Sequence, residues 1–207
     1  MKEKKIIISN KFFSNLFDKL FPLNRSLLGE GYEESLKILN QYIGFKFLKF
    51  KSGTKVFDWV VPKEWSIKSA YILTPDKKKI CDFKKNNLHV MNYSIAVNKI
   101  LDLRKLKKFL QSLKNLPAAI PYTTSYYKNN WGFNISHNQK NKLKPGNYKA
   151  VIKSEFKNGN LIVGEKILKG STKKDFLISS YLCHPSMANN ELSGPLVLLG
   201  LYEKLRK

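Results

Sequence analysis

The segment Cys183–Gly194 holds the side chains best suited to chemistry in this chain of 207 residues. It reads CHPSMANNELSG, which places one imidazole, one carboxylate and two carboxamides in a short polar stretch. Imidazole nitrogens and carboxylate oxygens are zinc ligands, and amides and hydroxyls orient such ligands by hydrogen bonding. Local composition alone favours a structural histidine over a metal ligand, so a metal site needs support from other features.

A nucleophilic thiol or hydroxyl is the competing interpretation of this segment. Cys183 is adjacent to His184, but neighbouring residues of a strand point to opposite faces, which argues against a catalytic pair. Ser193 has no Gly-x-Ser-x-Gly surroundings and is expected instead to cap the helix that follows. Neither residue is therefore predicted to be a nucleophile.

The segment lies between a predicted strand and a predicted helix. The apolar run 176–183 is typical of a buried strand, and residues 194–205 have helical character with Pro195 in the first turn. In open α/β sheets, ligands bind beyond the carboxyl ends of strands. Upstream, Asn158-Gly159 separates two strand-like runs, 148–156 and 161–168, and predicts a β-hairpin.

The first part of the chain is predicted to be helical and the middle part rich in strands. Apolar spacing predicts one helix over residues 12–20, ended by Pro22, and another over 36–43, ended by Gly44. A later helix is predicted to begin after Asp102, which can cap it. Its expected apolar stripe is Leu103, Leu106, Leu110 and Leu113, and short β-type runs precede it at 56–61, 69–73 and 80–83.

These elements predict an α/β fold in three parts. Residues 1–53 would form a helical part and 54–145 an inserted β-rich domain. Residues 146–207 would form a core of hairpin, strand, polar loop and helix, within a mixed sheet flanked by helices.

The net charge of +23 raises the question of a polyanionic partner. Only Arg25, Arg104 and Arg206 among the 38 basic residues are arginine, the side chain that dominates base readout. Lysines also occur throughout the chain, so we interpret the excess as a compositional habit and expect no specific nucleic acid. Salt-sensitive binding to nucleic acid or to an anionic membrane ranks last among the functional hypotheses.

No apolar run approaches the roughly 20 residues that span a bilayer. The run 6–8 is too short for a signal-peptide core. Cys81 and Cys183 provide no disulfide framework, which suits a reducing compartment. We therefore expect a cytoplasmic protein without a membrane span.

The loop 117–131 is rich in aromatic residues that could pack on the fold or line a cleft. Packing is the favoured interpretation, but Tyr126 and Trp131, together with the nearby His137, are candidates for contact with a substrate.

Several separated blocks resemble, in the same order, a bacterial aminopeptidase-like family that combines a zinc-aminopeptidase fold with an inserted β domain. Its members are often described only as domains of unknown function. The blocks are FPLNRSLLGEG (21–31), VVPKEWS (60–66), FKKNNLHVMNYSIAVN (83–98), AIPYTTSYYKNNWGFNISHNQ (119–139) and CHPSMANNELSGP (183–195).

The resemblance implies a site for one or two zinc ions. His184 matches the first zinc ligand, and Glu191 is the expected bridging carboxylate because Asn190 stands where the broader signature has aspartate. Ser186 replaces an aspartate that would orient the imidazole. Asn189, Asn190 and Ser193 would support the loop around the ligands. The general base and the remaining ligands are expected downstream of this chain, which would then be an N-terminal portion, inactive alone.

The first functional hypothesis is therefore part of a zinc-dependent hydrolase that cleaves a peptide or related amide bond. Its substrate would be a peptide or glycopeptide, and its partner a missing C-terminal half. The alternative is a non-catalytic module that binds glycan or peptide, since the resemblance also implies a link to surface polysaccharides.

Overall fold

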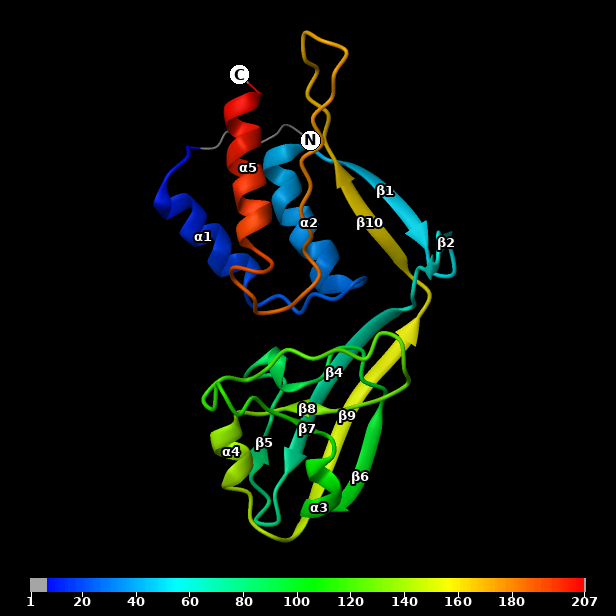
Figure 1. Cartoon of the computed structure of the whole chain (residues 1–207), viewed down its shortest axis with the longest axis vertical. Coiled ribbons are helices and arrows are strands. Elements are labelled where there is room, and N and C mark those ends of the chain that lie inside the picture. The colour runs from blue at the N-terminus through cyan, green and yellow to red at the C-terminus, as the bar shows by residue number, and fades with distance from the viewer. Residues whose placement is uncertain (1–6, 207) are drawn as a thin grey trace. The chain divides into compact units, whose positions relative to one another are not determined.

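The computed structural model describes residues 7–206, so Ile6 and the other first residues of the predicted helical part lie outside it. The chain forms two units. Unit 1 combines Met1–Glu64 with Asn158–Lys207, and unit 2 is Trp65–Lys157. Each unit has helices and small sheets of its own (Figure 1). The protein is therefore a mixed α/β structure, as predicted, although its sheets are smaller than the mixed sheet that we expected.

Unit 1 is built on three helices, α1 (Asn10–Leu20), α2 (Glu30–Ile43) and α5 (Ser193–Leu205). Ser9 caps α1 by accepting a hydrogen bond from the Phe12 amide at 3.2 Å. Gly44 ends α2 in the left-handed conformation, with φ of 65°. The predictions of the first two helices and of the residue that ends the second are confirmed. Among residues 7–206, no helix has the length and apolar content that crossing a bilayer requires.

The three helices lie together in Figure 1 and share one hydrophobic core. Each contributes large apolar side chains, and full burial of such a side chain stabilises the fold by roughly 1.5–3 kcal/mol. The core also receives residues from the polar segment before α5. Its buried members are Leu16, Leu20, Leu39, Ile43, Leu182, Leu192, Leu199 and Tyr202.

The strands of unit 1 form two-stranded antiparallel sheets. β1 (Lys46–Lys51) pairs with β10 (Asn160–Glu165), with Lys46 opposite Glu165. β2 (Lys55–Val56) pairs with β3 (Trp59–Val60).

The predicted hairpin around Asn158-Gly159 is wrong, although both of its strands exist. β9 (Asn147–Lys157) belongs to unit 2, whereas β10 pairs with β1 in unit 1. The Gly159 amide donates to Ser52 Oγ at 2.9 Å, and its carbonyl accepts from the Ser52 amide at 3.0 Å. A Cβ at Gly159 would also lie 2.6 Å from Glu64 Oε2. These contacts fix Asn158-Gly159 as the connection from unit 2 to unit 1 and not as a hairpin turn.

The predicted strand 176–183 is also wrong. This segment is irregular, and no strand of residues 7–206 pairs with it. Phe176 and Leu177 are 92% and 93% exposed, whereas Leu182 is buried at 5%. An apolar run becomes a buried strand only where neighbouring strands accept its backbone hydrogen bonds, and no such neighbour is present among the described residues.

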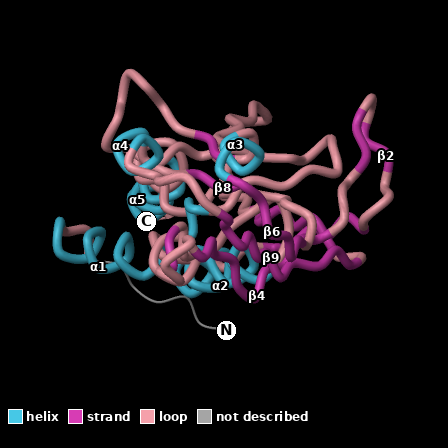
Figure 2. The backbone as a smooth tube through the Cα atoms, turned by 90° about the horizontal axis from the view of Figure 1, so that it is seen from below, coloured by secondary structure: helices cyan, strands magenta, loops and turns pink. Residues whose placement is uncertain are grey.

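Unit 2 contains a four-stranded sheet in the order β5, β4, β9, β6 (Figure 1), of which Figure 2 labels β4, β9 and β6. The strands not yet placed are β4 (Glu64–Leu73), β5 (Lys79–Ile80) and β6 (Val97–Asp102). β6 and β9 run antiparallel, with Val97 opposite Ile152. The start of β9 alternates, since Tyr148 and Ala150 are buried while Lys149 is exposed, but burial then continues through Val151 and Ile152.

Short elements complete unit 2. They are η1 (Asn87–His89), α3 (Leu103–Lys107), β7 (Leu110–Gln111), β8 (Phe133–Asn134) and α4 (His137–Asn141). Asp102 caps α3 as predicted, by accepting from the Lys105 amide at 3.0 Å. The helix is shorter than its apolar stripe suggested, because Leu110 is buried in β7, which pairs in parallel with β8. The leucine spacing therefore continues from a helix into a strand.

Replacing Gly31 with alanine tests the packing at the start of α2. The added Cβ would lie 2.2 Å from the backbone oxygen of Asn24, which cannot rotate away. Alanine should gain about 1 kcal/mol in helix propensity, but we expect the overlap to dominate and destabilise unit 1 by about 1–3 kcal/mol net. Urea unfolding measures this. Gly170→Ala is the matched control, because nothing lies within 4 Å of its Cβ position. Equal stability of the two variants would contradict the packing described here.

Candidate metal centre

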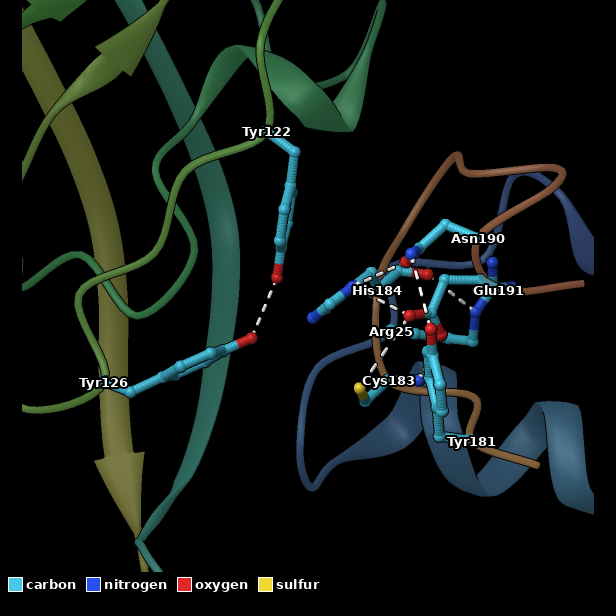
Figure 3. A network of polar contacts seen from close by, with 8 residues as sticks. All are labelled: Arg25, Tyr122, Tyr126, Tyr181, Cys183, His184, Asn190 and Glu191. Atoms are coloured by element: carbon cyan, nitrogen blue, oxygen red, sulfur yellow. Dashed lines mark hydrogen bonds and ion pairs between the residues drawn. The ribbon is translucent and has the colours of Figure 1, made fainter. Parts of the chain in front are cut away.

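Three potential metal ligands meet where the polar segment turns toward α5. The donor atoms of Cys183, His184 and Glu191 all lie within 4.8 Å of one another. His184, Asn190 and Glu191 point toward one another in Figure 3. Within residues 7–206, these three side chains lie close enough to one another to hold an ion. The two predicted ligands are therefore neighbours, and a third donor lies beside them.

Glu191 is the buried centre of this cluster, with 0% exposure. Its Oε2 accepts a hydrogen bond from the backbone amide of Cys183 at 2.6 Å, and its Oε1 lies 2.7 Å from His184 Nδ1. The Cys183 thiol is 3.9 Å from the same Oε1. The Glu191 carboxylate thus links the end of the loop to Cys183 and His184 at its start.

The imidazole of His184 is held at Nδ1 by two side chains, because the Asn190 Oδ1 lies 3.2 Å away in addition to Glu191. Burial lowers the pKa of His184, but interactions with Cys183 and Glu191 outweigh it and raise that pKa to about 10. Without a metal the ring is therefore protonated at neutral pH. Ligation would release a proton.

Arg25 supports the cluster from the start of the chain. Its side chain is fully buried, Nε donates to the His184 carbonyl at 2.9 Å, and another guanidinium nitrogen donates to the Leu20 carbonyl. Burial lowers the pKa of Arg25 to about 10, against the opposing charges of Glu191 and Cys183. The positive charge of the buried Arg25 guanidinium and the negative charge of the buried Glu191 carboxylate offset each other, whereas either charge alone would be costly to bury.

The remaining predicted loop residues have different positions. Asn190 lies on the imidazole and donates from Nδ2 to the Tyr181 hydroxyl at 3.4 Å. Ser186 has a left-handed backbone, with φ of 48°, and so marks the turn after His184. Ser193 is the first residue of α5 rather than its cap; the cap residue is Leu192, and Ser193 Oγ donates back to the Asn189 carbonyl at 2.5 Å.

The expectation that Cys183 and His184 point to opposite faces is wrong. It assumed a strand, but the segment is irregular, so the alternation of a strand does not apply. The cysteine sulfur is consequently close to the imidazole and to Glu191.

The donor set is appropriate for zinc, which binds imidazole nitrogen, carboxylate oxygen and thiolate sulfur. Two such ligands on tetrahedral zinc stand about 3.3–3.5 Å apart. The sulfur to Oε1 distance of 3.9 Å is near this value, whereas the Nδ1 to Oε1 distance of 2.7 Å is that of a hydrogen bond. With Nδ1 on the carboxylate, Nε2 is the ring atom that would ligate, as in carboxylate-histidine-metal arrangements. The donor types thus suit zinc, but in this arrangement Glu191 orients His184, and it could ligate the same ion only by giving up its contact with Nδ1.

The aromatic candidates belong to unit 2 and pack within it. Trp131 is 5% exposed and stacks on Phe109 with a centroid distance of 4.0 Å, so it is a core residue. Tyr126 packs edge-on against Tyr93, and its hydroxyl lies 2.8 Å from that of Tyr122 (Figure 3). His137 Nδ1 is 3.2 Å from Ser112 Oγ at the start of α4.

Sequence reasoning did not identify Arg25 and Cys183 as members of the site. Two signals pointed to Arg25: it is one of three arginines in a chain that otherwise uses lysine, and it lies in the block 21–31. The planar guanidinium can bond several carbonyls at once, which lysine cannot do. For Cys183 the local signal was its adjacency to His184, which the predicted strand led us to discount.

Comparisons with known proteins show which proteins the chain is similar to. Residues 64–155 match the family model described as "Domain of unknown function (DUF2172)". The chain is 43% identical over 193 residues to a Clostridium acetobutylicum protein named "Putative polysaccharide biosynthesis protein with aminopeptidase-like domain". It also matches the crystal structure of a "putative peptidase" from Clostridium acetobutylicum, with 42% identity and a TM-score of 0.88.

Each of these matches covers 93% of this chain, but only 44% of the named protein and 46% of the solved one. The chain therefore spans less than half the length of the relatives that it matches.

Replacing Glu191 with glutamine tests whether its charge supports the loop. Glutamine keeps the shape but leaves Arg25 without its buried counter-charge, so we expect a loss of about 3–5 kcal/mol in stability without added metal. Glu34→Gln is the control, since Glu34 is half exposed and lies 4.0 Å from Lys37. Urea unfolding of both variants decides the point, and a loss below about 1 kcal/mol in Glu191→Gln would rule out the supporting role.

The two cysteines should differ in reactivity. Burial raises the pKa of Cys81 to about 12, and this residue is 4% exposed, whereas Cys183 is partly exposed. At pH 8 we expect iodoacetamide to modify Cys183 in the native protein and Cys81 only in urea. Mass spectrometry of the wild type, Cys81→Ser and Cys183→Ser assigns each thiol. Native labelling of Cys81 at its rate in urea would be inconsistent with the burial described.

Proposed function

Because nearly the whole chain is similar to parts of proteins named as aminopeptidase-like and as a peptidase, we propose that it is part of a zinc-dependent, aminopeptidase-like hydrolase. The observation that carries the proposal is the cluster of Cys183, His184 and Glu191, whose donor atoms converge within 4.8 Å. A catalytic zinc site needs three protein ligands and an open position, and these residues would provide the three once Glu191 turns from His184 Nδ1 toward the ion.

Each residue of the cluster has a role in this proposal. His184 presents its imidazole, with Nδ1 held by Glu191 and Asn190. Arg25 fixes the His184 carbonyl and balances the charge of Glu191. When bound, zinc would lower the pKa of a water molecule and polarise the carbonyl of a peptide bond. The second zinc, the general base and the substrate, a peptide or glycopeptide, are also parts of the proposal.

The surface around α5 supports the participation of further polypeptide. Val197 and Leu205 are each 61% exposed, and the unpaired residues Phe176 and Leu177 are also exposed. A cavity of about 280 Å³ lies between this segment and α5, lined by Ile178, Ser179, Ser180, Ser193, Gly194, Val197, Leu198 and Leu201. Apolar surface of this kind is typical of an interface. We propose that it is covered by polypeptide equivalent to the unmatched part of the relatives.

Zinc content tests the proposed ligands. After dialysis against trace zinc, we expect the wild type to retain the metal and His184→Ala and Glu191→Ala to lose about tenfold or more in affinity. Mass spectrometry of the metal measures this. His89→Ala is the matched control, because His89 binds the Asn134 carbonyl in unit 2.

Cobalt substitution tests the third ligand. Thiolate ligation produces a charge-transfer absorption band, which should be present in the wild type and absent in Cys183→Ser. A band that persists in Cys183→Ser would exclude the thiol. Equal zinc retention in the wild type, His184→Ala and Glu191→Ala would exclude the site.

A further inference from the structure

Unit 2 contains a cavity that is distinct from the candidate metal centre. It lies between the first turn of α3 and the turn before β9, and its volume is about 630 Å³. It is broadly open to solvent. Its lining residues are Asp102, Leu103, Arg104, Lys107, Pro145 and Gly146.

Apart from Asp102, the lining of the cavity lies in a part of the chain without acidic residues. No Asp or Glu occurs from Leu103 through Ser154, whereas eleven Lys and Arg residues do. The general lysine excess does not explain this, because the 15 acidic residues of the chain all lie outside this segment. The segment therefore produces a local positive field, which attracts anions.

Lysines outside the lining of the cavity also contribute positive charge. Lys107 lines it and acts electrostatically on Lys140 together with Lys114. Burial lowers the pKa of Lys140, and the charges of these two lysines lower it further. Lys140 Nζ donates to the Leu110 carbonyl at 2.5 Å. A bound anion would relieve this repulsion.

The acidic member of the lining has cationic and amide partners of its own. Asp102 lies 3.3 Å from Lys105 Nζ and accepts from the Lys105 amide. Its charge is thus largely balanced locally. Arg104 and Lys107 are exposed, which leaves their side chains accessible to solvent and ligands.

We propose that this cavity binds an acidic oligosaccharide, whose carboxylates meet Arg104 and Lys107 while its sugar rings lie against Leu103 and Pro145. The nonpolar walls suit the C–H faces of a sugar, and the paired cations suit charges spaced along a chain. A nucleic acid fits less well, because the lining has one arginine and no aromatic side chain on which a base could stack. The proposal is independent of the metal centre, since it shares no residue with it.

Calorimetric titration of the full chain with an oligogalacturonate tests this proposal, with a neutral glucan of equal length and a DNA oligonucleotide as comparisons. We expect the oligogalacturonate to bind at moderate salt and the glucan not to bind. Arg104→Glu and Lys107→Glu should each weaken binding by about tenfold or more, because they reverse a charge at the ligand. Lys37→Glu, an exposed charge reversal on α2 in unit 1, is the matched control.

Three results would overturn the proposal: DNA binding as tightly as the oligogalacturonate, Lys37→Glu weakening binding as much as Lys107→Glu, or no binding of the acidic glycan. The first two would indicate unspecific charge attraction. Circular dichroism of each variant confirms its fold, and retention of zinc by Lys107→Glu separates this outcome from a failure of the metal site.

Discussion

The burial of the Glu191 carboxylate is the constraint on which the candidate site depends. A charge removed from water must be balanced by partners, and here the Cys183 amide, the His184 imidazole and the Arg25 guanidinium provide the balance. Arg25 in turn bonds the carbonyls of His184 and Leu20. These contacts connect the end of α1, the segment after residue 182 and the loop before α5, so the site and the core of unit 1 form together.

The interactions of Glu191 both stabilise the fold of the loop and position the potential metal donors. A carboxylate that holds a loop also fixes Nδ1 of His184, and the ring orientation that results is the one a metal ligand needs. In this arrangement Glu191 orients the ring, and direct ligation by Glu191 would require it to release Nδ1. The proton on the imidazole is what separates the metal-free arrangement from a ligated one.

The two units divide the chain's chemistry between them. The chain leaves unit 1 after Glu64 and returns at Asn158, so unit 2 lies in sequence between the two segments of unit 1. The close packing of Gly159 on Glu64 and its hydrogen bonds to Ser52 secure the return. The candidate metal donors lie in unit 1, and the basic cavity lies in unit 2. Substitutions in one can accordingly be studied without altering the other.

Local chemistry in the sequence determined the two helices predicted at 12–20 and 36–43, which the structure extends to 10–20 and 30–43, the caps at Gly44 and Asp102, and the grouping of His184, Asn190 and Glu191 in one loop. Such features depend on residues within a few positions of one another. Only the tertiary structure decided that β9 and β10 pair with different strands, that 176–183 is irregular, and that Arg25 and Cys183 join the site. Strand pairing and charge burial depend on partners far away in the chain, and a local pattern of apolar and polar residues does not specify those partners.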